Sequence, residues 1–288
     1  MARFVCGGLT TFDLAYFADA LPERGQKGTA ATSYFDVGGP VANAAVTAAL
    51  LGSDAEVHSV FGTGPFSLQA SDCLRRYGVA VVDHEPSIDL PVASVWIDQT
   101  GERTILSTDN RRSEVEGRPE LVQLEGVSAV LLDGHYPRLQ TMLAAMAAAA
   151  GVPIVLDCGR WRPVFADLLP VATDIVMTAT FRPPGLEAAT PAEAVVGMRE
   201  EYGAELVAAS RGPQPIATVD EYGLAEIEVP QVEVVDTTGA GDVLHGAYLH
   251  YRYAEGRSSF DALAAAGRVA SYSCAALGAR QLSAPGSG

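Results

Sequence analysis

The sequence contains very little lysine, few cysteines and no long apolar run. Lys27 is its only lysine, and no Gly-x-x-x-x-Gly-Lys-Ser/Thr motif is present, which excludes a P-loop nucleotide site. The four cysteines are widely scattered, without the spacing of a metal site or the density of a disulfide-stabilised scaffold. No apolar segment reaches the roughly 18 residues of a membrane span, and no signal-peptide pattern opens the chain. We therefore expect a cytoplasmic protein with reduced cysteines.

Positive charge is also scarce, since 35 acidic residues face 19 basic ones and the net charge is −16. Such a chain repels nucleic acid and anionic membrane surfaces, so we expect neither as a partner. Small molecules are the expected partners. Without a P-loop lysine, any phosphate group must be held by backbone amides, arginines and a metal ion.

Short apolar, β-rich runs alternate with stretches of helical spacing over most of the 288 residues. This alternation indicates βαβ units and a mostly parallel sheet with helices on both faces. Two segments, about 10–37 and 91–108, contain strand and turn patterns instead, and we interpret them as a small β-lid beside the sheet. The last residues, 283–288, have the composition of a flexible tail.

The segment VVDTTGAGDVLHGAYLHY, residues 234–251, places a glycine turn at the start of a helical pattern. Gly239, Ala240 and Gly241 have little or no side chain to block a ligand, and a helix N-terminus suits an anion. A capped helix with Asp242 in its first turn explains the same residues without a ligand. Other glycine- or aspartate-rich loops follow predicted strands at 36–43, 131–135 and 155–163, so these loops are expected to line one cleft.

Two motifs in a fixed order resemble the PfkB, or ribokinase-like, family of carbohydrate kinases. The first is GGLTTFDLAYFADALP followed by GGPVANAAVTAALLG, and the second is DTTGAGDVLHGA near the C-terminus. The resemblance covers nearly the whole chain. It implies a single ribokinase-like domain over 1–288, an α/β three-layer sandwich with a mostly parallel central sheet and a small β-lid.

The resemblance also implies the activity: ATP-dependent transfer of the γ-phosphoryl group to a sugar hydroxyl, with Asp242 as general base and the amides of Gly239, Ala240 and Gly241 facing the migrating group. The acceptor class is a ketohexose, a related polyol or a sugar acid. The expected sugar contacts are Asp13, Gly38, Gly39, Asn43, Arg103, Asn110 and His135. The expected nucleotide contacts are Ser210, Arg211, Gly212, Thr237, Gly239 and Gly241. The implied cofactors are ATP and Mg²⁺, with K⁺ as a candidate third at Asp236 and Thr238, and the implied assembly is a homodimer through the lid.

The chain departs from the family pattern at several positions. The segment Ala179 to Phe181 replaces the Asn-x-x-Glu motif that helps to place magnesium, and ASRGPQP keeps Gly212 but lacks a second glycine. In LDCGRWRP the arginines Arg160 and Arg162 are displaced from the related Asp-x-Asn-x-Arg pattern. Two alternatives therefore stay open: a nucleoside kinase of the same fold, and a non-catalytic sugar- or nucleotide-binding protein on a decayed kinase scaffold.

Overall fold

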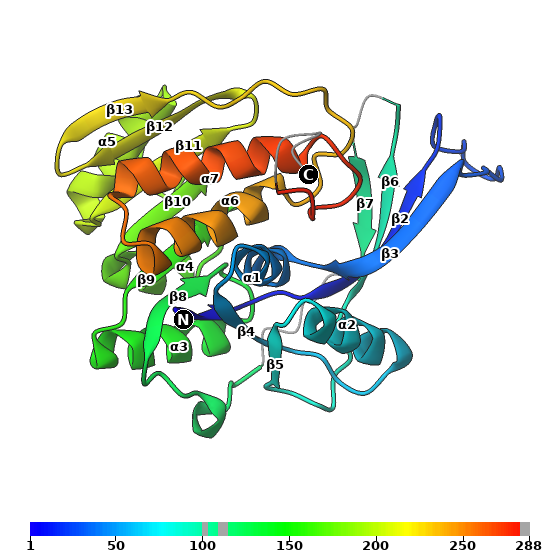
Figure 1. Cartoon of the computed structure of the whole chain (residues 1–288), viewed down its shortest axis with the longest axis horizontal. Helices are drawn as coiled ribbons and strands as arrows, with labels where there is room; N and C mark the ends of the chain where they lie inside the picture. Colours follow the sequence, from blue (N-terminus) through cyan, green and yellow to red (C-terminus); the bar gives the residue numbers. More distant parts are fainter. Residues whose placement is uncertain (100–102, 109–114, 283–288) are drawn as a thin grey trace.

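The computed structural model describes residues 1–99, 103–108 and 115–282 (Figure 1). Asn110, predicted as a sugar contact, and the predicted tail 283–288 lie outside the described residues. Within the described ranges, no helix is both long enough and apolar enough to span a membrane.

A nine-stranded sheet forms the centre of the molecule, in the order β13-β12-β11-β10-β9-β8-β1-β4-β5. The seven neighbouring strands β11, β10, β9, β8, β1, β4 and β5 run parallel. The hairpin β12–β13 extends the sheet beyond β11 with antiparallel pairing. The strands are β1 (Arg3–Gly7), β4 (Asp54–Ser59), β5 (Ala80–Asp83), β8 (Val127–Leu132), β9 (Ile154–Cys158), β10 (Asp174–Thr178), β11 (Leu206–Arg211), β12 (Gln214–Asp220) and β13 (Gly223–Ile227).

Helices cover both faces of this sheet, which gives three layers (Figure 1). One layer consists of α1 (Pro40–Leu50), α2 (Pro65–Arg76), α6 (Ala240–Leu249) and α7 (Ser259–Ser273). The other layer contains α3 (Pro137–Ala150), α4 (Phe165–Leu168) and α5 (Pro191–Tyr202). Short single turns are η1 (Pro119–Leu121), η2 (Leu169–Val171) and the π-turn η3 (His250–Ala254).

The central strands are continuous apolar runs because each of their faces is buried under helices. In β1, Phe4 and Cys6 belong to the core beneath α1 and α6, while Val5 belongs to the core beneath α3. Local sequence signals mark where helices begin and end. For example, α5 begins with a capping box between Thr190 and Glu193, and α3 ends at Gly151 in the left-handed conformation.

A second sheet of four strands, in the order β3-β2-β6-β7, stands beside the main sheet (Figure 1). Its strands are β2 (Thr11–Phe17), β3 (Thr32–Gly38), β6 (Val92–Ile97) and β7 (Arg103–Ser107). They come from the two segments in which the sequence predicts strands and turns without helices. We call this sheet the lid.

Candidate active site

The carboxyl ends of the parallel strands lie at one edge of the main sheet, where ligands bind in open α/β folds. β8 is followed there by Asp133, and Asp157 belongs to the end of β9. Helix α6 begins at the same edge: from its first turns, His245 reaches the carbonyl of Val176 in β10 (3.1 Å) and the carboxylate of Asp157 (3.6 Å). The site therefore lies between this edge, the start of α6 and the lid.

The pairing register of the lid directs its polar residues to this site. Asp13 of β2 pairs with Asp36 of β3, and Ile97 of β6 pairs with Arg103 of β7. β2 pairs with β6 so that Phe17 lies beside Ile97, and Phe17 shares a face with Asp13 because alternate residues of a strand point the same way. Asp13, Asp36 and Arg103 therefore project to the same side of the lid. On that side Arg103 donates a hydrogen bond to Oγ1 of Thr237 (2.7 Å). The lid thus closes onto the loop that precedes α6.

The glycine turn at the start of α6 leaves backbone amides free. Gly239 occupies the cap position with φ 73° and no side chain caps the helix. The amide of Ala240, predicted to face the phosphate, instead donates to the carbonyl of Thr237 (3.3 Å), because the chain enters the helix through a tight turn. The N–H groups of Gly241 and Asp242 make no hydrogen bond with the described residues, so they and the helix dipole are available to an anion.

Asp242 lies in the first turn of α6 and is bound to α1. Its Oδ2 accepts a hydrogen bond from Nδ2 of Asn43 (2.8 Å). Burial, and secondly the negative charge of Asp157, raise the pKa of Asp242 to about 7, although Asn43, His245 and Arg103 act in the opposite direction. A carboxyl group with this pKa can accept a proton near neutral pH.

Asp157 and His245 form the buried surroundings of this carboxylate. Nδ1 of His245 lies 2.7 Å from the carbonyl of Gly241, and Nε2 faces both the Val176 carbonyl and Asp157. Burial raises the pKa of Asp157, while His245 lowers it. The imidazole therefore offsets part of the repulsion between two buried carboxyl groups.

His135 follows β8 and lies between the side chains of Arg162 and Asp133. Its Nε2 accepts a hydrogen bond from Arg162 (2.6 Å), so the proton of a neutral ring belongs on Nδ1, which faces Asp133 at 3.1 Å. Asp133 also accepts hydrogen bonds from the amides of Leu9 and His135, both 2.9 Å long. The predicted sugar contact His135 is thereby fixed at the sheet edge.

Asp13 is held next to the glycines that precede α1. Thr11 donates to its Oδ1 (2.5 Å), and a Cβ on Gly38 would lie 2.0 Å from its Oδ2. Gly39, at φ 92°, is the cap residue of α1, and a Cβ there would meet the carbonyl oxygen of Leu9 at 2.4 Å. Only glycine allows this close approach of the loop to Asp13.

The family resemblance implies that Asp13 contacts the sugar, and on that expectation the pKa of Asp13 predicts a pH dependence of sugar binding. Burial raises this pKa to about 6, although Thr11 and Arg280 lower it. A protonated carboxyl group loses acceptor capacity for sugar hydroxyls, so we expect the sugar dissociation constant to rise as the pH falls through 6. Calorimetric titrations at about pH 5 and about pH 8 would measure this, with Asp13→Asn as the comparison. Equal pH dependence in both proteins would show that another group is responsible.

The segment after α7 closes the far side of the site. The amide of Gly278 donates to Oδ2 of Asp236 (2.9 Å), and the hydroxyl of Tyr34 reaches the same oxygen (3.3 Å). Oδ1 of Asp236 accepts from the amide of Thr238 (2.8 Å). Two residues further on, Arg280 enters the site, where it contacts Asn43 (2.9 Å).

The predicted nucleotide residues 210–212 lie at the end of β11, on the same sheet edge. Ser210 donates to the carbonyl of Met177 (3.4 Å), and Gly212 turns the chain into β12 with φ 61°. The guanidinium of Arg211 binds the Pro215 carbonyl (2.6 Å) and Glu226 (2.7 Å). Arg211 is therefore engaged within the β11–β12–β13 unit in this structure and is not free for a phosphate.

Asp36, Asp157 and Arg280 are not among the residues predicted from the sequence, and the structure brings them into the site. For Asp157 a signal existed, since an acidic residue ends an apolar strand. Asp36 similarly begins the loop 36–43, which was expected to line the cleft. Arg280 had no local signal: it lies 237 positions from Asn43 in the chain.

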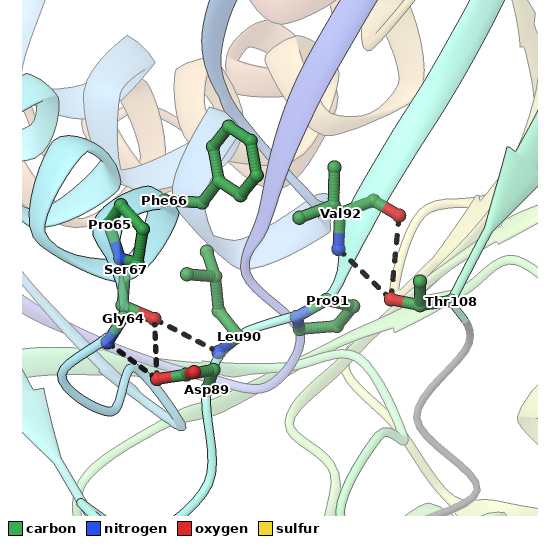
Figure 2. A pocket seen from close by; sticks show the side chains of 9 residues that line it. All are labelled: Gly64, Pro65, Phe66, Ser67, Asp89, Leu90, Pro91, Val92 and Thr108. Atoms are coloured by element: carbon green, nitrogen blue, oxygen red, sulfur yellow. Dashed lines mark hydrogen bonds between the residues drawn. The ribbon is translucent and has the colours of Figure 1, made fainter.

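A hollow of about 280 Å³ lies on the face of the lid that points away from Asp13 (Figure 2). It is lined by Gly64, Pro65, Phe66, Ser67, Asp89, Leu90, Pro91, Val92 and Thr108. Val92 pairs with Phe12, the neighbour of Asp13, and so faces away from that carboxylate. The hollow is therefore separate from the site around Asp242.

Comparison with known proteins defines the class of this chain. Residues 1–285 match the pfkB family of carbohydrate kinases, and the chain belongs to this family. It is 28% identical to the ribokinase of Bacillus subtilis, over 95% of this chain and 93% of the relative. It is also 28% identical to the 2-dehydro-3-deoxygluconokinase of Dickeya dadantii, over 88% of this chain and 92% of the relative. The protein is a sugar kinase.

Solved structures confirm the predicted fold class. The ribokinase of Thermotoga maritima superposes with a TM-score of 0.80 at 20% identity, covering 99% of this chain and 97% of the other. Arabidopsis thaliana ribokinase, in complex with ribose and ATP, gives 0.75 at 23% identity, with 97% and 95% covered. Escherichia coli phosphofructokinase-2, in complex with potassium, gives 0.78 at 20% identity, with 98% and 96% covered. The three-layer α/β sandwich with a lid is the ribokinase-like fold.

Proposed function

We propose that this sugar kinase transfers the γ-phosphoryl group of ATP to a sugar hydroxyl, with Asp242 as general base. The hydroxyl oxygen attacks the γ-phosphorus, the bond from that phosphorus to the β–γ bridging oxygen breaks, and ADP leaves. The hydroxyl proton passes to Asp242. Its position at the start of α6, with a pKa of about 7 and free amides beside it, is the observation that carries this proposal.

The amides of Gly241 and Asp242 would stabilise the charge on the migrating phosphoryl group, together with the helix dipole. On the acceptor side, Asp13, Asn43 and the backbone at Gly38 and Gly39 would hold sugar hydroxyls. His135 at the sheet edge and Arg103 on the lid would be further sugar contacts. An anionic acceptor is favoured by Arg162, for which the described residues provide no carboxylate partner, so a sugar acid joins ketohexoses and polyols as a candidate.

ATP would lie along the sheet edge toward β11, with Ser210, Gly212 and Thr237 as contacts and with Gly239 and Gly241 beneath the phosphates. Among the described residues, no three or more His, Cys, Asp or Glu side chains are arranged as a metal site. Mg²⁺ usually needs only one or two carboxylates plus substrate phosphates, so the residues fit an ion that enters with ATP. Asp157 is the carboxylate that would hold this ion or its waters, and the ion would neutralise phosphate charge.

Asp236 and Thr238 are the residues we propose for a monovalent cation such as K⁺. Oγ1 of Thr238 is buried and has no hydrogen-bond partner among the described residues, so an oxygen is available to a cation next to the Asp236 carboxylate.

For the assembly, we expect a homodimer through the lid, supported by the exposed side chains of Phe35 (58%) and Leu106 (75%).

A coupled ADP-release screen tests the proposed function. The acceptors would include ribose, fructose, 2-dehydro-3-deoxygluconate and a nucleoside, each assayed with ATP and Mg²⁺. We expect sugar-dependent ADP release that stops in excess chelator and that falls when K⁺ is replaced by a bulky organic cation. ADP release with the nucleoside alone would favour a nucleoside kinase, and no release with any acceptor would contradict the proposal.

A further inference from the structure

Arg280 reaches the site from the segment after α7 and binds three acceptors on β3 and α1. Its Nε donates to Oδ2 of Asp36 (3.3 Å), and its two terminal nitrogens donate to the Val37 carbonyl (2.8 Å) and to Oδ1 of Asn43 (2.9 Å). The guanidinium also lies over the ring of Tyr77, 5.2 Å from its centre. One side chain therefore joins the lid strand β3 to helix α1.

These contacts select one of two orientations for the amide of Asn43. With Oδ1 bound to Arg280, Nδ2 faces Oδ2 of Asp242 at 2.8 Å. A flipped amide would place its oxygen against the carboxylate and its NH₂ group against the guanidinium, so both contacts would become repulsive. Asn43 is buried, and water cannot easily compensate for either contact.

We propose that Arg280 is a positioning residue, which fixes the amide of Asn43 so that Asn43 holds the carboxylate of Asp242 for proton transfer. This inference rests on the function proposed above. Nδ2 of Asn43 donates a hydrogen bond to Oδ2 of Asp242, whereas Oδ1 of Asp242 accepts no hydrogen bond from the described residues. Oδ1 is thus the oxygen left for the sugar hydroxyl. Arg280 acts on it only through Asn43.

The position of Arg280 in the site favours this role over a simple anchor for the C-terminal segment. The segment is already anchored by the hydrogen bond from the Gly278 amide to Asp236 (2.9 Å). Arg280 itself lines a cavity of about 20 Å³ together with Asp13, Asn43 and Thr238. Such a cavity holds about one water molecule, so Arg280 packs closely against the groups of the site. The charge of Arg280 also helps to keep Asp13 ionised against the effect of burial on the pKa.

Kinetics of Arg280→Gln and Arg280→Lys test the proposal, using the acceptor sugar accepted best in the ADP-release screen. For Arg280→Gln we expect kcat to fall about tenfold or more because the base is misplaced, while the KM for ATP stays within about threefold. Arg280→Lys should also remain impaired, because one ammonium group cannot replace the planar fork that binds several acceptors. Arg252→Gln is the matched control: Arg252 follows the far end of α6, binds Glu205 (3.2 Å), and should leave kcat unchanged.

A double-mutant cycle shows whether Arg280 acts through Asn43. If it does, Arg280→Gln should add little to the loss caused by Asn43→Ala. Addition of guanidinium to Arg280→Ala should restore part of kcat, but should not do so for Asn43→Ala. Additive losses, a fully active Arg280→Lys, or a fully active Arg280→Gln would each overturn the proposal.

One readout does not depend on activity. In ¹⁵N correlation spectra, the Asn43 side-chain amide, assigned through Asn43→Ala, should give two resolved proton signals in the wild type. We expect both signals to change chemical shift in Arg280→Gln, because the amide loses the guanidinium that fixes its orientation against Asp242. If they are unchanged, Arg280 does not position Asn43. If the wild type phosphorylates no acceptor while these signals change as expected, the proposed function fails and the positioning of Asn43 stands.

Discussion

Replacing Asp242 by asparagine is expected to lower kcat by about 10² to 10⁴, the usual contribution of a general base. Asparagine keeps the shape of the side chain, and its carbonyl oxygen can still accept the hydrogen bond from Asn43. The KM for ATP should therefore change little. Steady-state ADP release on a verified sugar, compared between wild type and Asp242→Asn, measures this loss.

The fold should not weaken in this variant. Burial, followed by the charge of Asp157, raises the pKa of Asp242 from its usual value of 3.8 to about 7. A carboxyl group whose pKa is higher in the folded state favours unfolding once the pH exceeds its unfolded value, since the unfolded chain releases the proton more readily. The side chain that Asp242→Asn introduces carries no charge, so the melting temperature of this variant at about pH 8 should equal or exceed that of the wild type.

The wild-type pH profile follows from the same carboxylate. The base must be ionised, so kcat/KM should rise with pH through about 7, and the residual activity of Asp242→Asn should lack this rise. Asp220→Asn is a matched control, because Asp220 is also buried but binds the Tyr222 amide (2.9 Å) and Ser259 (2.8 Å) on another part of the molecule. It should reduce stability and spare kcat. Near-normal turnover in Asp242→Asn would assign Asp242 to helix capping alone.

Replacing Gly39 by alanine is expected to have the largest effect on the folded state. Gly39 has φ 92°, and a Cβ there would lie 2.4 Å from the carbonyl oxygen of Leu9 and 2.9 Å from Cα of Thr10. Backbone strain and overpacking together should cost about 2 to 6 kcal/mol of unfolding free energy. The loop beside Asp13 must also shift, so any folded fraction should bind sugar poorly.

Gly52→Ala separates strain from the steric effect. Gly52 has a similar φ of 102°, but a Cβ there would have no atom within 4 Å. It should therefore show only the cost of a left-handed residue, about 1 to 2 kcal/mol, and normal sugar affinity. Thermal or denaturant unfolding of both variants measures the difference. Equal losses in the two proteins would mean that the approach of Gly39 to Leu9 and Thr10 has no energetic consequence.

Several features of the site were predictable because their signals are local. The sequence DTTGAGD alone indicates a turn that opens a helix, because Gly239 can adopt positive φ and Asp242 suits the first turn. Alternating strand and helix patterns likewise predict a parallel sheet whose strand ends carry the ligand-binding loops. The strand and turn patterns at 10–37 and 91–108 predict a separate sheet. In each case, backbone geometry and hydrophobic period act over a few residues.

Other features required the tertiary structure. The hydrogen bond from Asn43 to Asp242 depends on how α1 lies against α6, and these helices are distant in the chain. The occupied guanidinium of Arg211 depends on Glu226 in β13, which becomes a neighbour only through the hairpin. The Ala240 amide donates to the Thr237 carbonyl instead of facing a ligand, because the turn before α6 is tight.

The sequence by itself determined the class of fold, the family and the residues at each strand end, because hydrophobic period, glycine conformation and motif order are properties of short segments. Only the tertiary structure decided the electrostatic state of the site. The pKa of Asp242 is raised first by burial and then by the charge of Asp157 from β9, and the orientation of Asn43 needs Arg280 from the C-terminal segment. Burial and charge coupling act between residues that are close in space, and no local pattern encodes those distances.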